Sequence, residues 1–291
     1  MLEYLIRQRV FDNTMNRNIK TEYGIEDLRY LMRRLRDPKT GCPWDLKQTY
    51  QSITSHTIEE VYEVVDAIER DDISHLSEEL GDLLFQIVFY SQLAEEQGQF
   101  SFGEIISSIT HKLIRRHPHV FPDGTLESSN MSMADAEIVK IKEVWETIKR
   151  QERSDKGLGK TLEDIPLALP ALNRALKLQK RAASVGFDWS DIKPVIEKIN
   201  EELAELDAEI KNGSRARMAE ELGDLLFSCV NLARHLELDP ETSLRGANQK
   251  FKRRFESMEL LAGEMKIEDH SSDELELLWR RVKQSEQHSL Q

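Results

Sequence analysis

The 291-residue chain contains only two cysteines, Cys42 and Cys229, which lie far apart and form no CxxC motif. This scarcity excludes a disulfide framework and a zinc finger, and it is typical of a reducing compartment. No apolar run approaches the roughly 18 residues of a membrane span. The N-terminus also lacks the apolar core of a signal peptide. We therefore expect a cytoplasmic protein without a membrane partner.

Positive charge is scarce as well, because 53 aspartates and glutamates outnumber 40 lysines and arginines and give a formal net charge of −13. A general nucleic-acid-binding protein needs a basic surface, so direct nucleic-acid binding is not expected. A polyphosphate ligand would instead need a local cationic site or a metal ion. The sequence also lacks any strand-like alternation of apolar and polar residues, which predicts an all-α fold.

The sequence does contain one acidic motif twice. Residues 59–63 (EEVYE) and 78–85 (EELGDLLF) return 142 positions later as residues 201–205 (EELAE) and 220–227 (EELGDLLF). A constant offset of 142 residues across both parts of the motif is not expected by chance. We therefore predict two tandem helical-bundle domains. The predicted divisions of the chain are an N-terminal extension (1–22), a first domain (23–150), a polar linker (151–160) and a second domain (161–291).

Apolar periodicity and helix-ending residues predict the helices within these domains. In the first domain they are expected near residues 25–36, 52–70, 74–96, 102–116 and 134–152. In the second domain they are expected before Gly186 and near residues 192–211, 215–237, 241–262 and 273–286.

Each acidic motif places two carboxylates on one helix face, because residues three apart are neighbours there. Like charges so placed cost an isolated helix roughly a few tenths of a kcal/mol per pair. Apolar stripes beside them predict packing against other helices. In the first domain these stripes are Val61, Val64, Val65 and Ile68, then Leu80, Leu83, Leu84 and Ile87. The carboxylates would then meet near a bundle interior, where a hard divalent cation offsets their charge.

Paired cations also recur in both halves. Lys112 and Arg116, like Lys250 and Arg254, are four residues apart and share a helix face. Two cations held together in a protein this acidic suit a diphosphate or triphosphate group. The alternative is a solvated basic face. Recurrence in register with the carboxylates favours the phosphate-binding interpretation.

The paired E-E-x-x-E and E-x-x-D motifs, together with the K-F-x-R-R segment, resemble the MazG family of the all-α NTP pyrophosphatase superfamily. The resemblance covers about residues 25–290 as two tandem MazG domains. It implies Mg²⁺-dependent hydrolysis of a nucleoside triphosphate to a nucleoside monophosphate and pyrophosphate. It further implies broad base specificity, a role in nucleotide pool control or house-cleaning, and a homodimer.

Carried over residue by residue, the resemblance implies a site in each domain. The implied metal ligands are Glu202, Glu205, Glu221 and Asp224 in the second domain, and Glu60, Glu63, Glu79 and Asp82 in the first. Lys250 and Arg254 are the implied phosphate contacts, with Trp279 near the nucleotide. Their first-domain counterparts are Lys112, Arg116 and Trp145.

A proton acceptor is also needed if a metal-bound triphosphate is attacked in line by water. Glu201 and Glu220 stand next to the predicted ligands, where either would take that proton or orient a ligand. The alternative for both is a helix-surface residue that aids solubility.

The two halves differ one helical turn before the acidic motifs. The second half has Lys198 and Arg217 at these positions, where the first half has His56 and His75. A permanent cation can contact phosphate, whereas a neutral histidine contributes less. We therefore predict that the second domain is the stronger catalyst and that the first is weak, regulatory or structural, with Lys198 and Arg217 as further substrate contacts.

Two other function classes are alternatives to hydrolysis. A di-iron carboxylate bundle typically uses Glu-x-x-His pairs, and none of the eight histidines follows a glutamate by three residues. A non-catalytic helical scaffold or a regulatory nucleotide-binding protein is the remaining alternative. Trp44, in the turn after the first helix, is interpreted either as a hydrophobic plug beneath the bundle or as a base contact.

Overall fold

The computed structural model describes residues 22–128, 138–155, 157, 160–263 and 265–289. These residues form α-helices and two short 3-10 helices, and no strand occurs among them. The prediction of an all-α fold is therefore confirmed. The chain divides into two compact units, Met1–Ile148 and Lys149–Gln291. Most of the predicted N-terminal extension lies outside the described residues. None of the described helices is both long and apolar enough to cross a membrane.

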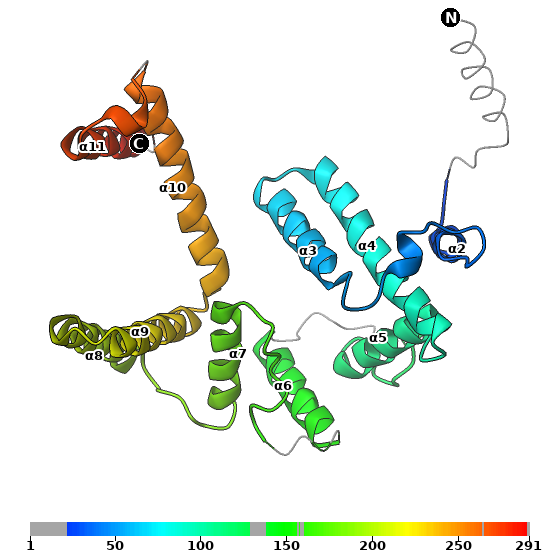
Figure 1. Ribbon diagram of the computed structural model, residues 1–291. Coiled ribbons are helices and arrows are strands. Elements are labelled where there is room, and N and C mark those ends of the chain that lie inside the picture. Colours follow the sequence, from blue (N-terminus) through cyan, green and yellow to red (C-terminus); the bar gives the residue numbers. More distant parts are fainter. Residues whose placement is uncertain (1–21, 129–137, 156, 158–159, 264, 290–291) are drawn as a thin grey trace, which may run out of the picture. The chain divides into compact units, whose positions relative to one another are not determined.

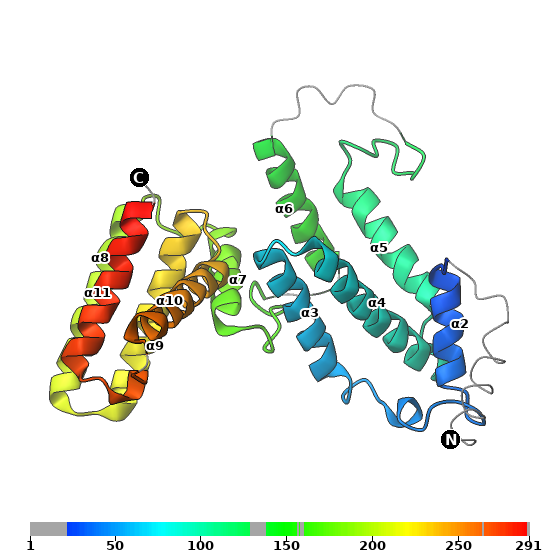
Figure 2. The same cartoon turned by 90° about the horizontal axis from the view of Figure 1, so that it is seen from above.

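The first unit is built on a helical hairpin, α3 (Thr54–Glu69) and α4 (Ile73–Glu96), whose helices lie side by side (Figures 1 and 2). Asp72 starts α4 by accepting a hydrogen bond from the backbone N–H of His75. The helices α2 (Ile25–Leu35) and α5 (Phe102–Arg116) both pack against α4. A 3-10 turn, η1 (Asp45–Lys47), lies between α2 and α3.

The second unit repeats this plan. Helices α8 (Ile192–Asn212) and α9 (Arg215–His235) form its hairpin, and α8 ends at Gly213, whose φ of 76° suits glycine. Helix α7 (Ala171–Ala183) packs on α9, and α10 (Pro240–Ala262) meets both. Helix α11 (Ser272–Ser289), which follows the short η2 (Ile267–Asp269), packs on the second half of α10 through Met258, Leu278 and Val282.

The predicted linker at residues 151–160 needs correction. Helix α6 (Ile138–Asp155) crosses the division between the two units and includes the first half of this stretch. Gln151, Glu152 and Arg153 are good helix formers, so a polar composition here is equally compatible with a surface helix. Charge and polarity alone therefore did not locate the end of the helix.

The hydrophobic core of the first unit lies along the second half of α4. Val88, Phe89 and Leu93 are buried there together with Met32 of α2 and Phe102 of α5. The carboxylate motif occupies the first half of the same helix. The hairpin therefore presents its acidic residues away from the packed end of the unit.

The apolar stripes beside the carboxylates are less covered than their periodicity predicts. Val61 is 43% exposed, Ile68 58% and Leu80 49%, and Leu203 and Leu222 of the second hairpin are similarly open. The prediction that these stripes pack against other helices is only partly met: other members of the same stripes are partly buried among the described residues, but these members are not. The reason is that few helices of the same unit reach this face, so the stripe remains a half-exposed surface.

Trp44 is also more exposed than one of its two interpretations allows. Its side chain is 54% exposed and its ring meets that of His56 edge-on, with 6.2 Å between centroids. A plug beneath the bundle would be buried, so this interpretation is wrong. The base-contact interpretation stays a prediction.

Candidate active site

The second hairpin brings three acidic side chains together. Carboxylate oxygens of Glu202, Glu205 and Glu221 all lie within 4.8 Å of one another. Helix α8 supplies the first two and α9 the third, so the meeting depends on the side-by-side packing of these helices. Glu202 is only 4% exposed. The fourth predicted ligand, Asp224, follows Glu221 by one turn on α9.

Electrostatics in this cluster favours an added positive charge. Burial raises the pKa of the Glu221 carboxyl, and the negative charges of Glu205, Asp224 and Glu202 raise it further. A raised carboxyl pKa means that the ionised form is held at a cost. A bound cation would remove that cost, so the cluster is an appropriate place for a metal ion.

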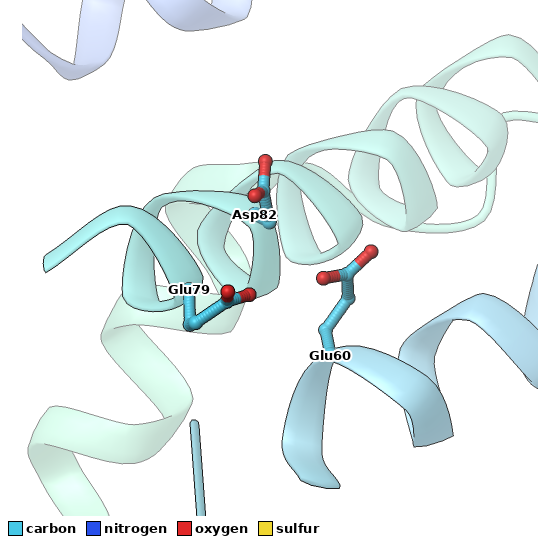
Figure 3. A group of neighbouring side chains, drawn as sticks. All are labelled: Glu60, Glu79 and Asp82. Carbon is cyan, nitrogen blue, oxygen red and sulfur yellow. The ribbon is translucent and has the colours of Figure 1, made fainter. Parts of the chain in front are cut away.

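The first hairpin contains a corresponding cluster. Glu60 of α3 faces Glu79 and Asp82 of α4, with oxygens within 4.8 Å of one another (Figure 3). Burial and the neighbouring carboxylates raise the pKa values of Glu60 and Glu79. The remaining predicted ligand, Glu63, is exposed and stands outside this group of three, although its charge contributes to both shifts.

The cations predicted beside the second cluster are arranged unequally. Lys198 Nζ donates to Glu202 Oε1 at 2.7 Å and to Glu201 Oε1 at 2.9 Å, and these hydrogen bonds raise the Lys198 pKa. Arg217 lies 3.4 Å from Glu209 and its side chain is 69% exposed. Lys198 therefore lies at the cluster, where it contacts both Glu202 and Glu201. Arg217 pairs instead with Glu209, which is not a predicted ligand.

Histidines take the matching places in the first domain, with different contacts. His75 Nε2 lies 2.8 Å from Glu79 Oε1, so a titratable ring contacts this cluster. His56, which matches Lys198, lies 3.7 Å from Glu59 and not beside Glu60. The first cluster therefore has no equivalent of the lysine that binds Glu202, among the contacts of the described residues.

The predicted phosphate-binding residues of the second domain form a separate group on α10 and α11. Arg254 pairs with Glu286 at 2.7 Å and lies 5.8 Å over the ring of Trp279. Trp279 also packs against Phe251, with 5.5 Å between centroids. Among the described residues, the ion pair of Arg254 is with Glu286 and not with the carboxylate cluster. Hydrogen bonds from Arg254 accordingly lower the Glu286 pKa.

The first-domain counterparts are distributed over α5 and α6. Trp145 meets His117 edge-on, with 5.0 Å between ring centroids. His117 directly follows α5, the helix that carries Lys112 and Arg116, and both of these side chains are partly buried. The C-terminal end of α5 therefore lies beside α6.

Sequence reasoning missed a cavity of about 630 Å³ that adjoins the second cluster. Glu202, Asp224 and Lys198 line one part of it, and Gln179 of α7 and Asn231 of α9 line another. No periodic motif marks these two amides, since they belong to different helices. Their common burial, at 8% exposure each, became visible only after the helices were packed.

Comparison with known proteins relates both hairpins to one family. The family model for the MazG nucleotide pyrophosphohydrolase domain matches residues 48–121 and again residues 191–258. Over 266 residues, the chain is 47% identical to a nucleoside triphosphate pyrophosphohydrolase of Escherichia coli, covering 90% of this chain and 98% of that protein. The chain belongs to the MazG family.

Each MazG match includes the carboxylate hairpin and the paired cations of the following helix, α5 or α10. The Thermotoga maritima protein named nucleoside triphosphate pyrophosphohydrolase/pyrophosphatase MazG is 43% identical over 266 residues, which is 90% of this chain and 97% of that protein. Both relatives are therefore similar to this chain across the tandem arrangement and not in one domain alone.

Proposed function

We propose that this chain is a cytoplasmic, Mg²⁺-dependent enzyme that hydrolyses free nucleoside triphosphates to nucleoside monophosphates and pyrophosphate. The observation that carries the proposal is the meeting of Glu202, Glu205 and Glu221 between two packed helices. The names of the Escherichia coli and Thermotoga maritima relatives support the substrate class. Nucleic acid is not the proposed substrate, because the chain carries a net charge of −13.

Magnesium fits the residues that are present. Each cluster offers carboxylate oxygens, which hard divalent cations prefer, and no sulfur ligand belongs to either group. The negative charges of Glu205, Asp224 and Glu202 raise the pKa of Glu221 in addition to the effect of burial, which supports a bound cation at this cluster. When bound, Mg²⁺ would neutralise triphosphate charge and lower the pKa of a coordinated water.

The remaining chemistry belongs to the side chains around the cluster. Glu202, Glu205, Glu221 and Asp224 would hold the ion, and Lys198 adds a fixed positive charge beside Glu202. Lys250, Arg254 and Trp279 stay proposed substrate contacts. Of the two proposed proton acceptors, Glu201 is already engaged by Lys198 at 2.9 Å, which favours Glu220 as the one that contacts the attacking water.

We infer that the second domain is the stronger catalyst. Lys198 contacts its cluster and is charged at all physiological pH values, whereas the carboxylate that the matching His56 contacts is Glu59 and not a member of the first cluster. A lysine beside the metal ligands can help to bind a phosphate group. The first domain is proposed to be weak, regulatory or structural.

The direct test is a panel of ribonucleoside and deoxyribonucleoside triphosphates with detection of pyrophosphate and monophosphate. We expect release with several bases in the presence of Mg²⁺ and loss of release after chelation with EDTA. A non-catalytic scaffold would release no pyrophosphate and would show no thermal shift with Mg²⁺ plus nucleotide. That pair of negative results would refute the proposal.

A homodimer is proposed from the open apolar surface of the hairpins. Large contiguous apolar patches on a soluble protein commonly mark interfaces. The half-exposed residues that form these surfaces are Val61, Ile68, Leu80, Leu84 and Ile87 in the first hairpin and Leu203, Ile210, Leu222, Leu226 and Phe227 in the second. Sedimentation equilibrium should give twice the 33.8 kDa chain mass, and a monomer at micromolar concentration would contradict the proposal.

A further inference from the structure

The cavity beside the second cluster has the dimensions of a small-molecule site. Its volume of about 630 Å³ falls within the range of about 300–1,000 Å³ that ligand pockets occupy. Glu202 and Asp224 line it, so a triphosphate held at the cluster would extend into it. The part beyond the carboxylates is bounded by α7, by α9 and by the loop that carries Phe187 and Trp189.

A buried glutamine in this wall has an unused acceptor. Gln179 Nε2 donates to the backbone oxygen of Phe227 at 2.8 Å, which fixes the orientation of the amide. Its Oε1 is buried and finds no donor among the described residues. A buried acceptor without a partner is costly. A ligand that supplies an N–H group would remove this cost.

Asn231, on the same wall, offers a hydrogen-bond donor where Gln179 offers an acceptor. Its Oδ1 accepts a hydrogen bond from Arg234 Nε at 3.0 Å, so the hydrogen-bonding group that remains is the Nδ2 donor. Arg234 is itself held, since Nη1 donates to Asp188 Oδ2 at 2.8 Å. These contacts fix the amide and also tie the Asp188 loop to α9.

Aromatic side chains border the same space. Phe187 and Trp189 flank Asp188 and both line the cavity. Their exposure, 82% and 43%, leaves ring faces accessible for stacking against a planar ligand. Base–aromatic stacking is tolerant of sequence because every base has a π-face.

The first domain has no amide at the position that matches Asn231. Phe89 precedes Asn231 by 142 positions, which is the register of the two acidic motifs. Phe89 is 1% exposed and lies in a hydrophobic cluster with Met32 and Val88. Where the second domain has a polar amide at a cavity, the first has a core phenylalanine.

We propose that this cavity is the nucleobase subsite of the second domain, with Gln179 as the acceptor and Asn231 as the donor for the base edge. The inference rests on the proposed function, because the carboxylate cluster must first hold the triphosphate. Adenine, guanine, cytosine and uracil each present a donor beside an acceptor on the Watson–Crick edge. An acceptor and a donor on the protein can therefore serve several bases, which agrees with the broad specificity proposed above.

The test uses Gln179→Leu and Asn231→Leu in the full chain, with ATP, GTP, CTP and UTP as substrates. Each change keeps side-chain volume close to that of the amide and removes its hydrogen bonds. Each variant should lose about three- to tenfold in kcat/KM through a higher KM, as expected for one hydrogen bond. The inhibition constant of inorganic tripolyphosphate, which has no base, should stay within about twofold of the wild-type value, because one hydrogen bond lost at the base leaves the phosphate contacts intact.

Gln86→Leu is the matched control. Gln86 is 7% exposed and its Oε1 also lacks a partner, but it lies on α4 of the first domain. Its KM values should match the wild type. The base subsite would be overturned if KM were unchanged in both cavity variants. It would also be overturned if the inhibition constant of tripolyphosphate rose as much as KM. A wild-type chain that releases no pyrophosphate would instead refute the proposed function.

Discussion

Glu205→Ala is expected to lower pyrophosphate release on the order of a hundred- to a thousandfold, whereas Glu63→Ala should leave most of the activity. Glu205 belongs to the group of three carboxylates that meet in the second hairpin. Glu63, at the matching position of the first hairpin, lies outside the corresponding group. If the proposed metal site is correct, the loss of one carboxylate ligand would weaken metal binding and with it the stabilisation of phosphate charge.

The comparison is informative because both side chains are exposed, so neither truncation opens a cavity in a core. Glu205→Ala also removes a charge that raises the Glu221 pKa, so the metal-free variant should unfold at a temperature equal to or slightly above the wild type. Pyrophosphate release with Mg²⁺ and thermal unfolding without it measure the two effects. Loss of activity in Glu63→Ala but not in Glu205→Ala would show that the roles of the domains are reversed.

Arg36→Met is expected to destabilise the first unit by about 2–3 kcal/mol. Arg36 is 9% exposed, donates to Glu96 at 2.6 and 2.8 Å and to the backbone oxygen of Asp45, and lies 5.4 Å over the ring of Phe89. The substitution leaves the Glu96 carboxylate and the Asp45 oxygen without this donor. The expected loss is below that of a fully buried pair because the Glu96 side chain is 34% exposed.

Urea unfolding measures the free energy of unfolding of Arg36→Met, and Arg70→Met is the control. Arg70 pairs with Asp66 at 2.7 Å, but both side chains are more than half exposed, so its loss should cost no more than about 0.5 kcal/mol. Equal stability of the two variants would contradict the prediction for Arg36.

The stability difference between wild type and Arg36→Met should also depend on pH. Burial alone would raise the Glu96 pKa, but hydrogen bonds from Arg36 bring it below its ordinary value of 4.5. A lowered carboxyl pKa contributes stability that is present above the unfolded pKa and is lost as the pH falls through the folded one. The difference should therefore be full at pH 7 and shrink below about pH 4.5.

Helix positions were predictable from sequence because the signals that determine them are local. Residues 52–70 and 74–96 were expected to be helical, and α3 and α4 span Thr54–Glu69 and Ile73–Glu96. Apolar periodicity and helix-ending residues act over a few residues. The end of α6 was missed because a polar surface helix and a polar linker have the same composition.

Burial was predicted less well for a physical reason. Periodicity shows that Leu80 and Leu84 share a face, but it does not show what covers that face. In the described chain they remain 49% and 39% exposed. The same reason left two interpretations of Trp44 open, because an aromatic residue after a turn can be buried or half exposed according to what packs over it, and the exposure of Trp44 excludes the plug.

The amino-acid sequence by itself determined that this is an all-α chain with two acidic hairpins, because carboxylates three residues apart and their repeat after 142 positions need only helix geometry. The resemblance of these motifs to the MazG family was also visible in the sequence. Tertiary structure alone decided that Glu202 meets Glu221, that Arg254 faces Glu286, and that Gln179 and Asn231 share a cavity wall. These relations join side chains from different helices. They depend on which helix faces pack together, and no local pattern of residues specifies that packing.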